Sequence, residues 1–422
     1  MRALYTVAFI FSLPLILLRL WWRGRRNPGY RARWWERFGI YRGTPLLDRP
    51  VWIHAVSVGE VSAASPLIKA LRDRHRQLPI LVTTTTPTGF DTVSRQFPGA
   101  VAHVYFPYDV PFVVRRLLRR FRPRALVLME TELWPNVVAV CTADGVPVYL
   151  VNARLSARSA ERYAILPRMT RKMLEGFSGI AVQNAADAAR FLDLGAPAAR
   201  TQVTGSMKFD VSYPASLREE GAALRRELGV NRPILMAGST RPGEEEVVLE
   251  AFAILRQRHP NCLLVLAPRH PERFESVVAM CRQRGFAVVS RRAGQACTED
   301  TAVFLLDTMG ELMCFYAASD VAFVGGSLVP AGGHNVLEPA VVGVPIVVGP
   351  HLFNFAEIST LLEAAGALKI VQGAADMAAM ASRWMSDSNA RDLAGCAGRD
   401  VVMQSRGATE RTLALLATSL GA

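Results

Sequence analysis

The sequence predicts an α/β protein with two doubly wound, Rossmann-like domains, each a parallel β-sheet covered by helices on both faces. Short apolar runs alternate with amphipathic stretches from residue 51 onward, which is typical of β–α units around a parallel sheet. The chain has 422 residues, of which 50% are hydrophobic. A chain of this length is too long for one ordinary hydrophobic core, and its hydrophobic residues are numerous enough to form two.

The first alternating block predicts seven strands with helices between them, for example at 61–77 and 110–121. The strands are expected at residues 51–55, 80–84, 101–106, 125–129, 146–151, 179–182 and 202–204. Residues 211–232 break the rhythm with Pro214 and a charged helical stretch, and Pro233 follows. We therefore place the domain boundary there and expect an N-terminal domain at 38–212 and a C-terminal domain at 213–422.

The second block repeats the same alternation. Its strands are expected at 234–238, 262–267, 287–290, 302–306, 321–324, 345–348 and 368–371. A final helical stretch at about 389–420 is long enough to cross back and pack on the first domain. Two such domains are expected to face each other across a cleft.

Residues 1–37 predict a membrane anchor followed by a basic interfacial segment. The apolar run at 3–18 is interrupted only by Thr6, Ser12 and Pro14, and arginines and tryptophans follow it. A cleaved signal peptide would carry its positive charge before the apolar run. The positive-inside rule places the bulk of the protein on the cytoplasmic face. Whether the anchor spans the bilayer or lies in its interface stays open.

The positive charge of the chain is concentrated in its first half. Residues 1–210 contain 30 Lys and Arg against 14 Asp and Glu, whereas residues 211–422 contain 19 against 22. A basic half indicates an anionic membrane or a phosphorylated substrate. Nucleic acid is disfavoured because no zinc finger, RNP motif or clear helix-turn-helix is present. The six scattered cysteines indicate a reducing compartment, with no disulfide framework or structural zinc.

Residues 325–350 predict a nucleotide site. An apolar run ends at paired glycines, a glycine-containing loop follows, and Asn335 opens a short helix that carries Glu338 and Pro339. Free backbone N–H groups of such a loop and helix start would hold an anion, and a carboxylate one turn in can accept from a ribose diol. The position, far along the chain, fits the donor half of a glycosyltransferase that uses a nucleotide sugar. A buried βαβ unit with glycine-rich turns is the structural alternative.

Polar motifs follow the expected strands of the first domain, where open α/β sheets bind their ligands. Glu60 ends the motif HAVSVGE, Glu130 and Glu132 lie in METELWPN, and Lys208 lies in GSMKFD. A partly buried carboxylate can take the proton of an attacking sugar hydroxyl. A nearby cation can offset negative charge that develops as the donor bond breaks. Ordinary solvated side chains remain the alternative for each of these residues.

These motifs, together and in this order, resemble those of the 3-deoxy-D-manno-octulosonic acid (Kdo) transferases. The resemblance covers nearly the whole chain, and it includes PGYRARWWERFG, SVGE, METELWPN, NARLS, GSMKFD, PRHPERF, DTMGEL and HNVLEPA. It implies the glycosyltransferase B (GT-B) fold and transfer of Kdo from CMP-Kdo to the tetraacylated, bisphosphorylated lipid A precursor. The acceptor would be met at the cytoplasmic face of the inner membrane, in lipopolysaccharide assembly. No cofactor and no metal at the reaction centre are implied.

The resemblance assigns the general-base role to Glu60 and a transition-state role to Glu130. The role of Lys208 in offsetting negative charge is inferred from its positive charge and its position after the last strand of the domain, not from the resemblance. Because CMP is a good leaving group, direct displacement with inversion is expected. The resemblance places CMP binding on the donor-side positions Pro268, Arg269, Met309, Gly310, Glu311, Asn335, Val336, Leu337 and Glu338. Two positions depart from the family pattern: Val336 stands where proline is expected, and Arg241 where histidine is expected.

Other functions stay open beside this one. A glycosyltransferase of peptidoglycan synthesis that uses UDP-N-acetylglucosamine would carry a glycine-rich loop after the first strand, where this chain has SVGE with one glycine. A sugar-nucleotide epimerase would have little need of an anchor. If the chain is instead a non-catalytic, membrane-associated binding protein, Glu60→Ala changes no activity, because there is none.

Overall fold

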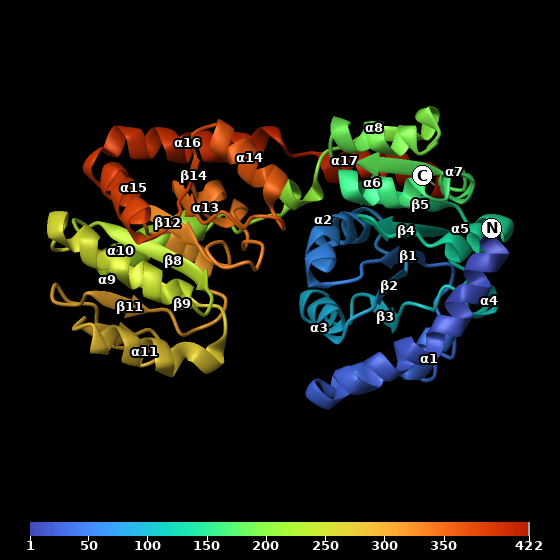
Figure 1. Cartoon of the computed structure of the whole chain (residues 1–422), viewed down its shortest axis with the longest axis horizontal. Helices are drawn as coiled ribbons and strands as arrows, with labels where there is room; N and C mark the ends of the chain where they lie inside the picture. The colour runs from blue at the N-terminus through green and yellow to red at the C-terminus, as the bar shows by residue number, and fades with distance from the viewer. Residues whose placement is uncertain (421–422) are drawn as a thin grey trace. The chain divides into compact units, whose positions relative to one another are not determined.

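The computed structural model describes residues 1–420 and shows two compact units (Figure 1). Unit 1 comprises Met1–Ser212 together with the chain from Ser405 onward, and unit 2 comprises Tyr213–Gln404. Two covalent connections therefore join the units, one near residue 212 and one near residue 404.

Unit 1 is built on a fully parallel seven-stranded sheet in the order β3-β2-β1-β4-β5-β6-β7. The strands are β1 Val51–His54, β2 Ile80–Thr84, β3 Ala102–Tyr105, β4 Ala125–Met129, β5 Val148–Ala153, β6 Gly179–Val182 and β7 Thr201–Val203. Each predicted strand of the first block is confirmed to within two residues at either end. The doubly wound order puts β1 beside β4, where the chain changes direction across the sheet.

Helices follow the strands of unit 1 and cover the sheet. They are α2 Val58–Arg74, α3 Pro87–Gln96, α4 Pro111–Phe121, α5 Pro135–Ala143, α6 Ala157–Ala164, α7 Pro167–Leu174 and α8 Ala185–Asp193. Four of them, α3, α4, α5 and α7, begin with proline, which lacks only an N–H that a helix start leaves unbonded. Helix α2 begins three residues before the predicted start, so Glu60 lies in its first turn.

The sheet of unit 1 buries both of its faces, which explains its near-continuous apolar strands. Trp52 and Leu126 pack in the hydrophobic cluster on one face, whereas their neighbours Ile53 and Val127 pack in the cluster on the other. Successive side chains of a strand point to opposite faces. Because helices cover both faces, a ligand can reach the sheet only beyond the ends of its strands, and open α/β sheets bind ligands at the carboxyl ends.

Unit 2 contains a second parallel seven-stranded sheet, in the order β10-β11-β9-β8-β12-β13-β14. Its strands are β8 Ile234–Thr240, β9 Leu263–Pro268, β10 Val288–Ser290, β11 Val303–Leu305, β12 Val321–Val324, β13 Ile346–Val348 and β14 Leu368–Ile370. Its helices are α9 Leu217–Leu228, α10 Glu244–Arg258, α11 Phe274–Gln283, α12 Leu312–Ala317, α13 Leu337–Val342, α14 Ala356–Ala364, α15 Ala374–Ser386 and α16 Ser388–Gln404. The second predicted set of strands is confirmed with the same tolerance.

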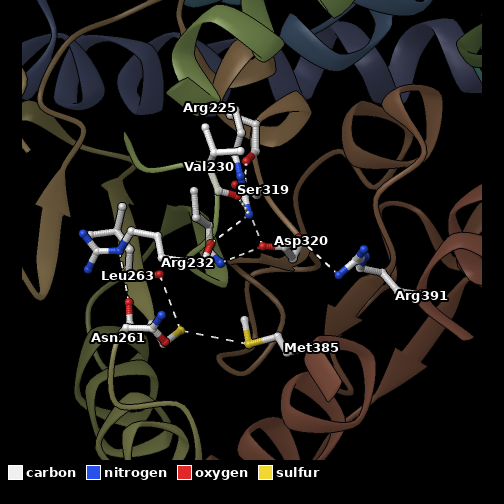
Figure 2. A network of polar contacts seen from close by, with 12 residues as sticks. Arg225, Val230, Arg232, Asn261, Leu263, Ser319, Asp320, Met385 and Arg391 are labelled. Carbon is white, nitrogen blue, oxygen red and sulfur yellow. Dashed lines mark hydrogen bonds and ion pairs between the residues drawn. The ribbon is translucent and has the colours of Figure 1, made fainter. Parts of the chain in front are cut away.

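A polar network closes the amino-terminal edge of the unit 2 sheet (Figure 2). Asp320, directly before β12, accepts hydrogen bonds from Nη1 of Arg225 at 2.9 Å and from the backbone N–H of Ile234 at 2.8 Å. Its other oxygen pairs with Arg391 of α16 at 3.3 Å. One carboxylate thus ties α9, β8 and α16 together at the edge opposite the polar loops.

The expected single helical stretch at 389–420 is instead two helices, α16 and α17 Ala408–Leu420. The break falls at Gly407, whose φ of 98° is readily adopted only by glycine. Asp210 of unit 1 accepts from the backbone N–H groups of Gly407 at 2.7 Å and Thr409 at 2.6 Å. Helix α17 then packs on α2 and on strands β5 and β6.

Helix α1, Arg2–Arg26, contains the apolar run and belongs to unit 1. Within residues 1–420 it is the single helix long and apolar enough to cross a membrane by length and composition, with a mean hydropathy of 2.0. Two 3₁₀ turns, Pro28–Tyr30 and Trp34–Phe38, lead from it into the sheet.

Candidate active site

Glu60 is fixed at the carboxyl edge of the unit 1 sheet, next to the end of β1. It is the third residue of α2, and its Oε2 accepts a hydrogen bond from the backbone N–H of Val56 at 2.8 Å. The turn between β1 and α2 therefore sets the position of the carboxyl group. Within residues 1–420, the remaining oxygen, Oε1, accepts no hydrogen bond from the protein.

Two further carboxylates come from the loop after β4. Glu130 has a φ of 56°, a conformation that is costly for a residue with a Cβ. Its carboxylate pairs with Nε of Arg154 at 3.1 Å and with Nζ of Lys208 at 3.9 Å. The structure thus brings Glu130 and Lys208 together, as two of the residues singled out in the sequence.

Glu132, at the same edge of the sheet, has a half-buried side chain. Its Oε2 accepts from Nε1 of Trp134 at 2.7 Å and lies 3.7 Å from Nε2 of His54. His54 is fully buried, stacks on Phe106 at 3.6 Å between ring centroids, and places Nδ1 3.0 Å from Oγ1 of Thr83. His54 therefore holds a fixed ring orientation beside Glu132.

The charges of Glu132 and Glu130 act on the carboxyl group of Glu60. Burial, followed by the charges of Glu132 and Glu130, raises the pKa of Glu60 to about 8, while the Val56 N–H and Arg154 oppose the shift. A carboxyl group in this state gains and loses its proton near neutral pH, which suits proton transfer.

Lys208 lies on a short 3₁₀ turn, Met207–Asp210, that follows β7. Asn152, buried at the end of β5 with a φ of 51°, accepts the backbone N–H of Met207 at its Oδ1 at 3.0 Å. The NARLS motif thereby positions the GSMKFD motif. Sequence reasoning did not assign a role to Arg154, Asn152 or His54, although all three lie in motifs that follow strands.

The predicted donor residues of unit 2 lie at or after the ends of three strands. Pro268 ends β9 and Arg269 follows it, Met309–Glu311 come after β11, and Asn335–Glu338 come after β12. Arg241, one of the two departures from the family pattern, follows the neighbouring strand β8. In the sheet order β11-β9-β8-β12 these ends are neighbours. The parallel sheet therefore brings the predicted residues to a single edge.

Cationic side chains gather around His334 at this edge. Nε of Arg241 donates to Nε2 of His334 at 3.3 Å. Burial and the neighbouring Arg241, Arg269 and His270 lower the pKa of His334 to about 4, so the ring is neutral at pH 7. Arg269 is exposed, which leaves a guanidinium suited to fork-like contact with phosphate.

Glu338 lies in the first turn of α13, within the electrostatic influence of Arg269. Nδ2 of Asn335 donates to its Oε1 at 3.2 Å, and Oδ1 of Asn335 accepts from the N–H of Leu337. Burial raises the pKa of Glu338 to about 7, against the opposing effects of Asn335 and Arg269. Val336, the helix N-cap, is fully buried with a φ of −74°, close to the value that proline imposes.

The expectation that the glycine loop offers free N–H groups is wrong for three of its residues. The backbone N–H groups of Gly326, Ser327 and Leu328 donate to the carboxylate of Glu244, at 2.6, 2.9 and 2.9 Å. Glu244 is fully buried at the start of α10. An internal carboxylate thus occupies the position that the sequence suggested for a bound anion.

The Met309–Glu311 segment starts α12, with Glu311 as its N-cap. The carboxylate of Glu311 pairs with Nη2 of Arg291 at 2.8 Å, so the backbone rather than this side chain is available at the helix start. Gly310 has a φ of 93°. In residues 1–420 no group of three or more His, Cys, Asp or Glu side chains is arranged to hold a metal ion.

Two Rossmann-like units, each with its polar residues at the carboxyl edge of a parallel sheet, define a glycosyltransferase of the GT-B fold. Residues 234–401 match the family described as glycosyl transferases group 1, and residues 32–211 match the family described as 3-deoxy-D-manno-octulosonic-acid transferase. The chain belongs to the Kdo transferase family. It is 40% identical over 418 residues to a 3-deoxy-D-manno-octulosonic acid transferase of Haemophilus influenzae, which covers 98% of both chains.

A second curated relative, the 3-deoxy-D-manno-octulosonic acid transferase of Bordetella pertussis, is 39% identical and covers 100% of both chains. Several solved structures resemble this chain in fold but have little sequence identity to it. A UDP-GlcNAc 2-epimerase from Neisseria meningitidis matches with a TM-score of 0.59 at 13% identity, over 87% of this chain and 100% of that one. A glycosyltransferase from Rickettsia africae matches with a TM-score of 0.57 at 11% identity, over 88% and 99%.

Proposed function

We propose that this Kdo transferase moves Kdo from CMP-Kdo to the tetraacylated, bisphosphorylated lipid A precursor in lipopolysaccharide assembly. An acceptor hydroxyl oxygen attacks the anomeric carbon of Kdo on the face opposite CMP. The bond to the phosphate oxygen breaks, CMP leaves with the electron pair, and Glu60 takes the hydroxyl proton. A single displacement of this kind inverts the anomeric configuration.

The observation that carries the proposal is the environment of Glu60. Its carboxyl group has a pKa raised to about 8 by burial and by Glu132 and Glu130, yet it is held in place by the Val56 N–H. A general base is most effective when its pKa lies near the working pH. A glutamate that served only the helix dipole would have no need of two carboxylate neighbours.

The two ion pairs of Glu130, with Lys208 and with Arg154, support stabilisation of the departing negative charge at the same edge of the sheet. Nζ of Lys208 is 3.9 Å from Glu130 and Nε of Arg154 is 3.1 Å from it. Glu130 holds both cations in position, and they offset the negative charge of the donor carboxylate and phosphate as the bond breaks.

On the donor side, unit 2 would bind the CMP part of the donor. Arg269 meets the phosphate, and the backbone at the start of α12 reads the edge of the base. Glu338 accepts from the ribose diol. The residues assigned to this site are Pro268, Arg269, Met309, Gly310, Glu311, Asn335, Val336, Leu337 and Glu338.

The acceptor is assigned to unit 1, which carries the excess of basic residues. A bisphosphorylated glycolipid in an anionic membrane is a partner that such a surface attracts. The arginines between residues 19 and 37 lie in the C-terminal part of α1 and just after it, and they are the candidates to contact the acceptor phosphates. The proposal places the catalytic units on the cytoplasmic face of the inner membrane.

Transfer of radiolabelled Kdo from CMP-Kdo to the lipid A precursor tests the proposal. We expect Glu60→Gln to lower kcat by at least ~100-fold, as loss of a general base does, with little change in CMP affinity. Glu175→Gln, at the exposed end of α7, is the matched control and should keep wild-type turnover. Absence of transfer by the wild-type protein would refute the activity, and near-full turnover of Glu60→Gln would refute the assigned base.

A further inference from the structure

Helix α1 presents two different stripes along its length. Six of its exposed large apolar side chains recur every three or four residues, as on one face of a helix, and they are Leu4, Val7, Phe11, Leu15, Leu18 and Trp22. Ile10 and Trp21 are exposed as well. Phe11 alone is 78% exposed. The residues between them, at positions 5, 6, 9, 12, 13, 16, 17 and 20, are partly buried. One stripe therefore faces unit 1 and the opposite stripe faces outward.

The first turn of α1 is attached to buried groups of unit 1. The hydroxyl of Tyr5 bonds to the carboxylate of Asp109, and Oγ1 of Thr6 lies 3.1 Å from Oδ1 of Asn136. Asp109 is 1% exposed and accepts the backbone N–H groups of Asn136 and Val137 at the start of α5. The contact is thus specific and polar rather than a general apolar packing.

The far end of α1 returns to the same unit. Arg31 donates to the carbonyl of Trp21, and a Cβ at Gly29 would lie 2.8 Å from Cβ of Pro87, the first residue of α3. Arg33 then donates to the carbonyl of His103 at 2.6 Å, and Glu36 accepts the N–H of Tyr105 at 2.9 Å. Both ends of α1 are therefore held by unit 1.

These two attachments bear on how α1 meets a bilayer. A helix of 25 residues is about 37 Å long, enough to cross a hydrocarbon core of about 30 Å. If α1 crossed it, Tyr5 and Gly29 would lie at opposite surfaces. Their partners Asp109 and Pro87 belong to one folded unit, and the buried carboxylate of Asp109 would have to enter the lipid, at high cost.

We propose that α1 does not span the membrane but lies along it, with its exposed apolar stripe in one leaflet and both ends on the side of unit 1. The occupant of this surface is an anionic lipid leaflet. Exposed arginines at positions 2, 19, 23, 25 and 31 flank the stripe and complement lipid phosphates. Trp22, 59% exposed near the end of the stripe, suits the headgroup level.

The arrangement places the membrane beside the candidate active site, and this step rests on the proposed function. Asn136 lies in the first turn of α5, after β4, and Pro87 starts α3, after β2, so both ends of α1 meet the carboxyl edge of the sheet. In the sheet order, β1 lies between β2 and β4, and Glu60 follows β1. An acceptor held in the same leaflet by its acyl chains can present its hydroxyl to Glu60 without leaving the membrane surface.

Spin labels on the exposed stripe test how α1 lies. Single cysteines replace Leu4, Phe11 and Leu18 in the full chain carrying Cys396→Ser, on vesicles of phosphatidylethanolamine and phosphatidylglycerol. We expect all three labels at one shallow depth, ~5–10 Å below the phosphates. Depths that differ by ~10 Å from one label to the next, as seven helical residues along the membrane normal require, would overturn the proposal.

Sidedness gives a second, independent measurement. With the protein outside sealed vesicles, a membrane-impermeant maleimide should label Ala3→Cys as fast as it does after detergent opens them. Labelling of that cysteine only after opening would show a spanning helix. Phe11→Glu should weaken vesicle binding at least tenfold. Leu393→Glu should not change it, because Leu393 is a similarly exposed leucine on α16 of unit 2. Equal binding of Phe11→Glu and wild type would contradict the lipid-facing stripe.

Failure of this inference is distinguishable from failure of the proposed function. Kdo transfer to acceptor dispersed in detergent measures the chemistry without a bilayer and is run on every cysteine variant. Retained transfer also shows that each variant is folded. If α1 spans the membrane and transfer is intact, only the proposed arrangement of α1 is refuted. If the wild-type protein shows no transfer, the proposed function is refuted.

Discussion

The carboxyl group of Glu60 has a proton affinity set by the fold rather than by its own chemistry. Burial and two neighbouring carboxylates raise its pKa to about 8, so the proton binds more tightly in the folded chain than in the unfolded one. Such a group stabilises the protein fully below its unfolded pKa. That contribution is lost as the pH rises through the folded pKa.

Glu60→Gln should therefore be more thermostable than wild type at high pH. The uncharged amide cannot suffer the penalty of a buried charge, so we expect a gain of a few degrees in Tm at pH 9 and almost none at pH 4.5. Calorimetry of both proteins at the two pH values measures this difference. An equal Tm difference at both pH values would mean that the buried charge is not its cause.

Glu338 gives the matching prediction on the donor side. Its pKa, raised to about 7 by burial, means that the carboxylate form is lost as the pH falls through 7. If this carboxylate accepts from the ribose diol, CMP affinity should fall as the pH drops from 8 to 6. Glu338→Gln should bind CMP roughly tenfold more weakly, as loss of a charged hydrogen bond does, and show no such pH dependence. Isothermal titration with CMP provides both quantities, and a variant that keeps the wild-type pH profile would contradict the assignment.

At the scale of elements, the glycine loop and helix α10 form one structural unit. The carboxylate of Glu244 accepts the N–H groups of Gly326, Ser327, Leu328 and Arg241. Within residues 1–420, no other carboxylate accepts four backbone N–H groups. The loop after β12 thus has a fixed shape before any donor binds, which reduces the entropy cost of binding.

Glu244→Ala should destabilise unit 2 by ~2–4 kcal/mol, because it leaves several buried N–H groups without an acceptor. Hydrogen exchange measured by mass spectrometry should accelerate in peptides covering 325–350 and leave peptides of β1–β4 in unit 1 unchanged. Glu250→Ala, on the exposed face of the same helix, is the control. Unaltered exchange at 325–350 would mean that the loop keeps its shape without Glu244.

The regular elements and the side chains that follow the strands could be predicted from the sequence, because both depend on local patterns. Every strand and the positions of Glu60, Glu130 and Glu338 followed from apolar runs and their ends. The partners of the glycine loop did not, since Glu244 lies about 80 residues earlier in the chain. The pairing of Arg154 with Glu130 and the attachment of Tyr5 to Asp109 are likewise contacts between separate elements, which no local pattern reveals.

At the scale of the whole molecule, the chain leaves unit 1 near residue 212, builds unit 2, and returns at residue 405. The return depends on Asp210, which caps the start of α17 through Gly407 and Thr409. Arg411 of α17 also donates to the carbonyl of Thr204 at 2.8 Å, and Tyr149 bonds to Ser419. Helix α17 is therefore part of the fold of unit 1, although it is the last helix of the chain.

Asp210→Ala should for this reason weaken unit 1 and spare unit 2, although residue 210 adjoins the boundary between them. Loss of two backbone hydrogen bonds to a carboxylate is expected to cost ~2–3 kcal/mol. Six of the seven tryptophans lie in unit 1 and only Trp384 in unit 2, so urea unfolding followed by tryptophan fluorescence reports mainly on unit 1. Its midpoint should fall, while CMP affinity stays at the wild-type value. Asp193→Asn, at the exposed end of α8, should leave the midpoint unchanged. An unchanged midpoint for Asp210→Ala would show that α17 holds unit 1 together through its apolar packing alone.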